Sequence, residues 1–135
     1  MTWSVEFIEE AEKDLDKLDH STQIQVIKGI MKVSKNPLSA NEGGYGKPLG
    51  NKKDINLTTL YKIKFKNIGI RVVYKLERVD DVMKIIVIST RTDEQVYKEA
   101  EKRRKKYWIW KSFKNIFETF LSIKTFYFWI NFRHS

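Results

Sequence analysis

The sequence predicts an α+β fold: a small antiparallel β-sheet with an N-terminal helical hairpin packed on one face, followed by a C-terminal helix. Two stretches with helical periodicity lie near the N-terminus, and three runs of strand length follow them with no helix between. Such separate groups of helices and strands are typical of α+β folds, whereas parallel α/β folds alternate them. The length of 135 residues fits one main domain.

The first third of the chain predicts a strand and the helical hairpin. Residues 2–7 alternate apolar and polar side chains, as a strand does. Residues 8–19 have apolar side chains at helical spacing, and their early acidic residues suit the positive end of a helix dipole. A second helix is predicted over residues 21–35, with Ser21 as its N-cap and a stop before Pro37. So short a break joins the two helices into a hairpin.

The middle of the chain predicts a loop and then an antiparallel meander. Residues 39–54 hold four of the six glycines, and their spacing fits no phosphate-binding loop, so we interpret this stretch as a plain loop. Residues 59–66 and 71–77 alternate in the strand period. Residues 82–89 are nearly all apolar, as expected for an interior strand that is covered on both faces.

The helix predicted after these strands is capped by Asp93 or Thr92 and ends near Lys106. We expect a main domain over residues 1–106 and a separate C-terminal extension over residues 107–135. The inner side of the helix is expected to hold Val96, Tyr97 and Ala100.

The extension at residues 107–135 differs in composition from the rest, since it holds 11 of the 18 aromatic residues. One interpretation is an amphipathic helix that, with the basic run at residues 102–106, lies on an anionic membrane. A second is additional packing against the domain or a partner. A third, which we favour, is read-through or frameshifted sequence without a function. An exposed apolar segment of this kind promotes aggregation.

Charge and composition limit the possible functions. The net charge is +9, and residues 61–106 alone hold 14 basic and 7 acidic side chains, which favours a polyanionic partner such as nucleic acid. The absence of cysteine excludes a disulfide scaffold and a cysteine nucleophile, and two histidines are too few for a histidine metal cluster. No secretory signal or membrane-spanning run is predicted, so we expect a cytoplasmic protein with no cofactor.

Basic side chains recur on one face of the predicted sheet. Lys62 and Lys64 lie on one strand face, and Arg71 joins that face if the hairpin pairs it with Lys66. Arg91 follows the last strand, and Tyr97 lies near the start of the next helix. The candidate catalytic residues are therefore Lys62, Lys64, Arg71, Arg91 and Tyr97.

Such a concentration of cations favours an anionic ligand, because the cations otherwise repel one another. Phosphate fits, since arginine binds it as a fork and lysine as a point charge. Nearby cations would lower the pKa of Tyr97, so that it could carry a proton. This combination indicates RNA cleavage without a metal, in which the ribose 2′-OH attacks the adjacent phosphate. The alternative is that Lys62 and Lys64 belong to an ordinary solvated strand face.

Four segments of the sequence share a pattern with a known family: 61–64 (YKIK), 69–74 (GIRVVY), 88–91 (ISTR) and 96–100 (VYKEA). They resemble the RelE/ParE superfamily of toxins from type II toxin–antitoxin systems, and the resemblance extends from the first strand to Lys106. It implies the RelE branch, whose members cut mRNA in the ribosomal A site, with all five candidate residues matched. It also implies that Arg71 and Arg91 hold the phosphate, while Tyr97 or a lysine takes the 2′-OH proton.

The resemblance also implies an antitoxin partner, expected to be acidic and encoded next to this protein. Asp93 and Glu94 depart from the more basic connection that the RelE branch often has. The alternatives to a ribosome-dependent nuclease are a ParE-like inhibitor of DNA gyrase, which generally lacks this set of five residues, and a basic membrane-associated protein that acts through its extension. Further candidate RNA contacts are Lys66, Lys75, Arg103 and Arg104.

Overall fold

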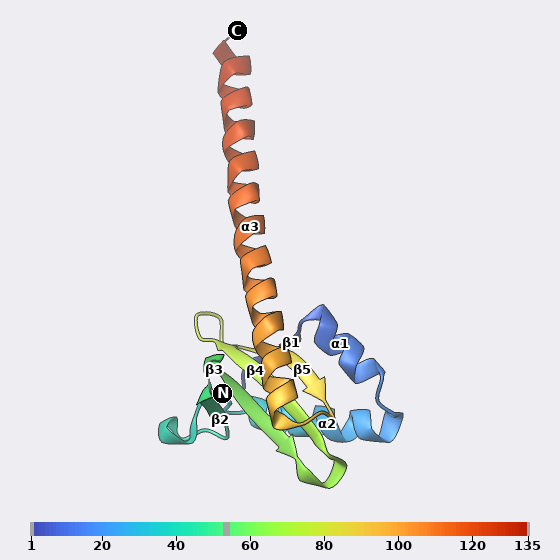
Figure 1. Cartoon of the computed structure of the whole chain (residues 1–135). Coiled ribbons are helices and arrows are strands. Elements are labelled where there is room, and N and C mark those ends of the chain that lie inside the picture. Colours follow the sequence, from blue (N-terminus) through green and yellow to red (C-terminus); the bar gives the residue numbers. More distant parts are fainter. Residues whose placement is uncertain (1, 53–54, 135) are drawn as a thin grey trace. The chain divides into compact units, whose positions relative to one another are not determined.

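The computed structural model describes residues 2–52 and 55–134, with side chains at residues 2–50 and 59–122. Within these residues the strands form one five-stranded sheet, ordered β1-β5-β4-β3-β2 (Figure 1). The elements in chain order are β1 (Ser4–Phe7), α1 (Glu9–Asp16), α2 (His20–Ser34), the 3-10 turn η1 (Ala40–Glu42), β2 (Lys47–Lys52), β3 (Ile55–Phe65), the 3-10 turn η2 (Lys66–Ile68), β4 (Ile70–Glu77), β5 (Val82–Ser89) and α3 (Asp93–His134).

The chain divides into two compact units, Met1–Lys102 and Arg103–Ser135. The first unit holds the whole sheet, the α1–α2 hairpin and the beginning of α3, and the second consists of the rest of α3. The α+β fold class predicted from the sequence is confirmed. The sheet is mixed, because β1 runs parallel to β5 while every other pair of neighbours is antiparallel.

Helices cover both faces of the sheet in the first unit. On one face α2 approaches β3 so closely that a Cβ atom on Gly29 would lie 2.3 Å from the Phe65 ring. On the other face the Lys62 ammonium lies 5.9 Å from the centroid of the Tyr97 ring, near the start of α3. Phe65 and Lys62 are three residues apart on β3 and therefore point to opposite faces. The hairpin and the beginning of α3 thus cover different faces, and the face of α3 carries the lysines.

The register of the β3–β4 hairpin corrects one prediction. Arg71 pairs with Lys64, not with Lys66. Lys66 instead begins η2, and Gly69 closes this turn with a φ of 63°, a conformation that glycine adopts without steric cost. The turn takes up Lys66, so the strand pair starts two positions earlier than predicted. Because a shift of two residues keeps each side chain on its face, Arg71 still joins the face of Lys62 and Lys64.

The stretch at residues 39–54, predicted as a plain loop, contains a strand. β2 pairs antiparallel with β3 at the edge of the sheet, with Lys47 opposite Lys62. Its register shifts between Pro48 and Gly50, and Gly50 has a φ of 65°. Proline and glycine argue against a strand in an isolated sequence, but an irregular edge strand tolerates both. The neighbouring strand, rather than local propensity, makes this segment extended.

The helices also begin and end differently from the prediction. The N-cap of α2 is Asp19 rather than Ser21, because the Asp19 carboxylate accepts hydrogen bonds from the Thr22 backbone N–H at 3.3 Å and the Thr22 hydroxyl at 2.6 Å. α3 does not end near Lys106 but continues to His134. No glycine or proline interrupts this stretch of sequence, so nothing in it terminates the helix.

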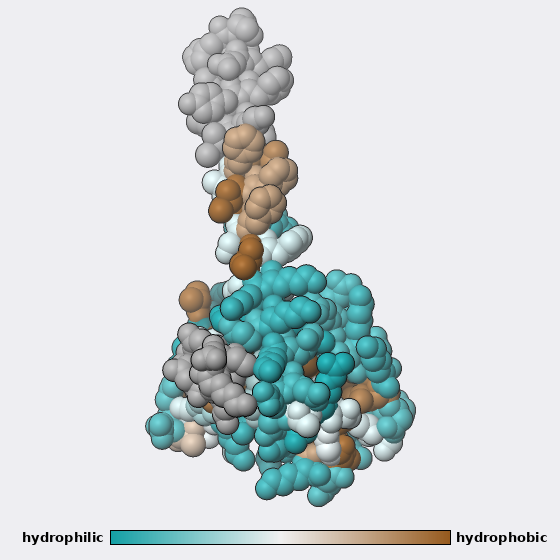
Figure 2. Space-filling view, viewed as in Figure 1, coloured by the Kyte–Doolittle hydropathy of each residue, from teal (hydrophilic) through white to brown (hydrophobic). Residues whose placement is uncertain are grey.

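Beyond the boundary at Arg103, α3 presents large apolar side chains to solvent, and Figure 2 shows them in brown along the helix. Within the residues described, no helix is both long enough and apolar enough to cross a membrane. For residues 123–134 the structure describes the backbone, which is helical, but not the side chains. The predicted roles of the extension remain predictions. The exposed apolar residues are Ile109, Trp110, Phe113, Ile116, Phe117, Phe120 and Leu121.

The core lies between the sheet and its helices, and the predicted interior strand is confirmed. Seven of the eight residues of β5 are buried. The predicted inner side of α3 is also confirmed, since Val96, Tyr97 and Ala100 are at most 3% exposed. Tyr74 is fully buried on β4 and donates a hydrogen bond from its hydroxyl to the Pro37 carbonyl at 2.9 Å. This hydrogen bond connects the segment just after α2 to the sheet.

Candidate nucleic-acid interface

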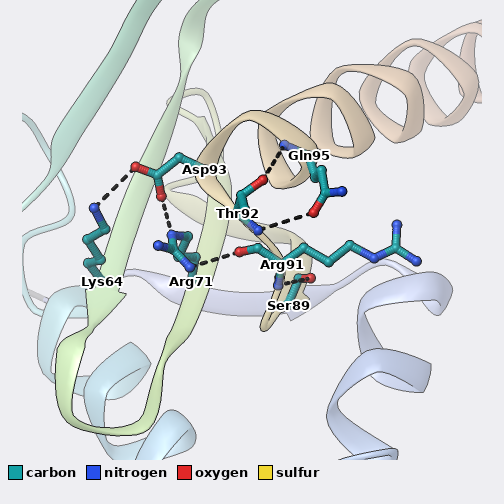
Figure 3. Close-up of polar contacts among 7 residues, drawn as sticks. All are labelled: Lys64, Arg71, Ser89, Arg91, Thr92, Asp93 and Gln95. Carbon is teal, nitrogen blue, oxygen red and sulfur yellow. Dashed lines mark hydrogen bonds and ion pairs between the residues drawn. The ribbon is translucent and has the colours of Figure 1, made fainter.

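The lysine face of the sheet brings two of the five candidate residues onto one acidic side chain. Lys64 on β3 and Arg71 on β4 are direct partners in the register. The Lys64 ammonium lies 3.2 Å from Oδ2 of Asp93, and the Arg71 Nε donates a hydrogen bond to Oδ1 (Figure 3). Each cation therefore holds one oxygen of the same carboxylate. We call Lys64, Arg71 and Asp93 the anion cluster.

The first turn of α3 positions Asp93. Thr92 Oγ1 accepts a hydrogen bond from the Gln95 backbone N–H at 3.5 Å, and Gln95 Oε1 accepts one from the Thr92 N–H at 3.3 Å (Figure 3). This reciprocal pair is a capping box, which satisfies two backbone donors at the helix start. Thr92 therefore caps the helix, and the Asp93 carboxylate is left to face the sheet.

Arg71 also fixes the connection that carries Asp93. Its Nη1 donates a hydrogen bond to the Arg91 carbonyl at 2.8 Å, and the Arg91 N–H donates to Ser89 Oγ at 3.1 Å. The Arg91 side chain, in contrast, points away from Lys64 and Arg71 (Figure 3). The structure thus brings the backbone of Arg91 to the anion cluster but not its guanidinium.

Lys62 and Tyr97 form a second contact on the same face. The Lys62 ammonium lies over the Tyr97 ring, 5.9 Å from its centroid, and Tyr97 is 3% exposed. The predicted net lowering of the Tyr97 pKa is wrong, because this pKa is raised. Burial raises this pKa, the Asp93 carboxylate raises it further, and the opposing effects of Lys64 and Arg71 are smaller. Tyr97 is therefore a neutral phenol at physiological pH.

The four other candidate RNA contacts are distributed differently. Lys66 is exposed on η2, at the end of the hairpin that carries Lys64. Lys75 is half-buried on β4, two register pairs from Lys62, opposite Leu60. Arg103 and Arg104 belong to the second unit, whereas the cluster belongs to the first. These roles remain predictions.

The fold has counterparts among solved structures, although no protein-family model and no curated protein matches the chain. An arginine double mutant of the E. coli toxin RelE in the free state is 29% identical, with a TM-score of 0.60 over 76% of this chain and 98% of that chain. The same mutant in complex with the antitoxin peptide RelBc is 26% identical, with a TM-score of 0.57 over 74% of this chain and 95% of that one. The chain is a RelE-like toxin.

A third match shows the fold alone. The toxin–antitoxin complex RelBE2 from Mycobacterium tuberculosis is 22% identical, with a TM-score of 0.55 over 69% of this chain and 95% of that chain. The match extends over nearly the full length of these RelE toxins. About a quarter of the present chain, in contrast, lies outside the match to the E. coli structures.

Sequence reasoning missed one contact of this site, that of the Asp93 carboxylate with Lys64 and Arg71. The sequence marks Asp93 as a helix-start residue and as an acid in a connection expected to be basic. Burial raises the pKa of Asp93, but hydrogen bonds from Lys64 and Arg71 and their charges lower it by more, so the pKa lies below its usual range. Asp93 is an anion at physiological pH, and the predicted cations already hold it. The available signal was an acidic residue four positions after the end of β5, in a connection expected to be basic.

Proposed function

We propose that this RelE-like toxin is a metal-independent endoribonuclease that cleaves mRNA in the ribosomal A site. The observation that carries the proposal is the anion cluster, in which Lys64 and Arg71 jointly bind both oxygens of one carboxylate. The same two donors would bind two oxygens of a phosphodiester, because both groups are paired oxyanions. The similarity to RelE toxins supports RNA as the source of the phosphate, because the resemblance to the RelE branch implies cleavage of mRNA.

The proposed reaction is an internal phosphoryl transfer. The ribose 2′-oxygen attacks phosphorus and loses its proton, and the bond to the 5′-oxygen breaks as that oxygen gains a proton. The products are a 2′,3′-cyclic phosphate and a 5′-hydroxyl. Lys64 and Arg71 stabilise the charge that builds on the phosphoryl oxygens. Tyr97, Lys62 and Arg91 are the further candidates.

The ionisation state of Tyr97 indicates which proton transfer this residue would perform. A phenol whose pKa is raised carries its proton at neutral pH, so Tyr97 suits the role of acid toward the departing 5′-oxygen better than that of base. The Lys62 ammonium lies over the Tyr97 ring. By attracting the negative charge that develops on the departing 5′-oxygen, it would keep that oxygen close to the phenol. Arg91 would have to rotate its side chain toward the phosphate to take part.

We also propose an antitoxin partner. Several matched structures are complexes of RelE with RelB-type antitoxins. The positive charge of residues 61–106 suits an acidic antitoxin, expected to be encoded beside this protein in a cytoplasmic toxin–antitoxin system.

Mapping RNA 5′ ends after a brief induction in cells tests the proposed activity. For the wild type, ligation specific for 5′-hydroxyl ends is expected to reveal new RNA ends inside translated codons. Arg71→Ala is expected to reduce the number of these ends at least 100-fold, because the variant loses a group that stabilises the transition state electrostatically. Lys28→Ala removes one exposed positive charge from α2, on the other face, and serves as the matched control. New ends that are equal in wild type and Arg71→Ala, or growth arrest without new ends, would contradict the proposal, and the second result would favour gyrase.

A further inference from the structure

Two cations of the proposed site, Lys64 and Arg71, already bind an anionic side chain of the same protein in this structure. The Asp93 carboxylate contacts Lys64 through Oδ2 and Arg71 through Oδ1. A phosphodiester offers two oxygens in a similar arrangement. The carboxylate therefore lies where the substrate phosphate is expected.

We propose that Asp93 is a built-in competitor of the substrate: its carboxylate occupies the phosphate position on Lys64 and Arg71, and RNA has to displace it. This inference rests on the proposed function for the identity of the substrate. It adds a residue that sets the affinity of the site and the level of activity of the toxin.

The first argument is that helix α3 does not need Asp93 as its cap. The capping box between Thr92 and Gln95 already satisfies the start of the helix. Glu94 supplies a second acidic group to the same first turn. Asp93 can therefore release the cations without leaving the helix start uncapped.

The second argument is that the contact is accessible. The side chain of Asp93 is 39% exposed, and those of Lys64 and Arg71 are 35% and 25% exposed. A carboxylate at this depth can rotate into water, so an incoming phosphate can replace it without unfolding of the surroundings. Exposed ion pairs of this kind are weak.

The third argument is quantitative. The site binds phosphate only in the fraction of molecules in which Asp93 has left it, so the apparent affinity falls by that fraction. An ion pair of ordinary strength at this exposure corresponds to about a fivefold penalty. Asp93 therefore attenuates binding without abolishing it.

A titration of the purified full chain with inorganic phosphate tests the proposal. The NMR signal of the Arg71 Nε–H group, assigned by its absence in Arg71→Lys, reports on what that group binds. Asp93→Asn keeps the shape of the side chain and removes its charge, and it is expected to bind phosphate about fivefold more tightly than the wild type. Asp93→Ser, which also suits the first turn of a helix, is expected to behave in the same way and replaces Asp93→Asn if that variant does not fold.

Glu94→Gln is the matched control. Glu94 is the next residue, is exposed, forms an ion pair with Lys98 at 3.2 Å and does not belong to the anion cluster. The same loss of charge at this position is expected to change phosphate affinity by less than twofold, because the contact to Lys64 and Arg71 is intact. Equal tightening by Asp93→Asn and Glu94→Gln would overturn the proposal, since it would indicate a general charge effect. Weaker binding by Asp93→Asn would also overturn it, since Asp93 would then position the cations.

The phosphate titration contains no cleavage step, so its outcome is independent of the nuclease assay. Tighter binding by Asp93→Asn in a protein that produces no new RNA ends would support a masked anion site and contradict the nuclease. New RNA ends that depend on Arg71, together with unchanged phosphate affinity in Asp93→Asn, would support the nuclease and contradict the role of Asp93.

Discussion

At the scale of single residues, the site is set by which ionisable groups face one another. Lys64 and Arg71 face an acid, and Tyr97 faces the core as well as the cations. Distance to a cation alone predicted a lowered pKa for Tyr97. Burial and the Asp93 carboxylate outweigh the cations and raise it.

The ionisation of Tyr97 leads to a prediction about pH. Its pKa is raised above the ordinary value of 10.0, so the folded protein holds the phenolic proton more tightly than the unfolded chain does. This group therefore leaves stability unchanged below about pH 10 and destabilises the fold as the pH rises further. The absorbance titration of the wild type minus that of Tyr97→Phe is expected to show a phenol that ionises at higher pH than N-acetyl-tyrosinamide. If the phenol in the difference curve ionises at the same pH as the free compound or at a lower pH, the assignment of Tyr97 as an acid is contradicted.

The residue types of the site were predictable, but their arrangement was only partly so. Strand periodicity is sufficient to place Lys62 and Lys64 on one face. It does not reveal that η2 includes Lys66, which moves the partner of Arg71 to Lys64. Nor does any local pattern indicate that Asp93 reaches across to β3 and β4, because that contact depends on how α3 packs over the sheet.

At the scale of elements, the segment between α2 and β3 shows how neighbouring structure overrides propensity. Gly46 pairs with Ser39, and its N–H donates a hydrogen bond to the Leu38 carbonyl at 2.8 Å. The chain then enters β2, which is extended because it pairs with β3. The helices and the three later strands carried their own periodicity and were predictable, whereas β2 did not and was missed.

The close packing of this segment against β4 leads to a prediction about stability. A Cβ atom at Gly46 would lie 2.4 Å from the Pro37 carbonyl oxygen and 2.7 Å from the Tyr74 hydroxyl, so Gly46→Ala is expected to destabilise the protein by about 1–3 kcal/mol. Urea denaturation measures this change in the free energy of unfolding.

Gly43→Ala is the comparison for that experiment. Gly43 has a φ of 81° with nothing within 4 Å of an added Cβ atom, so alanine there meets only conformational strain of about 1 kcal/mol. We expect Gly46→Ala to be the more destabilising of the two. The reverse order would show that the segment can move away from Pro37 and Tyr74.

At the scale of the whole molecule, the two units have different compositions. The first, Met1–Lys102, contains the sheet, the anion cluster and the core. The second presents a stripe of exposed apolar side chains on a helix, among them Ile109 and Phe113, which are 68% and 67% exposed. The sequence predicted a change of character near this position, but not that a single helix would continue through it.

Removal of residues 107–135 deletes most of the second unit, Arg103–Ser135. The truncated chain is expected to keep the melting temperature of the full chain within about 4 °C, because the buried residues of α3, Val96, Tyr97 and Ala100, remain. It is also expected to be more soluble, since the exposed apolar stripe is gone. Circular dichroism melting and analytical ultracentrifugation measure these properties. A truncated chain that unfolds or aggregates would indicate that the extension packs on the domain.

The parallel pairing of β1 with β5 has a consequence for how this protein is made. Ser4 at the start of the chain pairs with Val82, and Glu6 pairs with Lys84. The first strand emerges from the ribosome several seconds before its partner at ordinary translation rates of about 5–20 residues per second. Until then β1 has no partner strand, because β5 lies between it and β4. Such distant pairing slows folding. Lys64, Arg71 and Asp93 are also brought together late, so a nascent chain holds no assembled anion cluster until nearly the whole first unit has been synthesised.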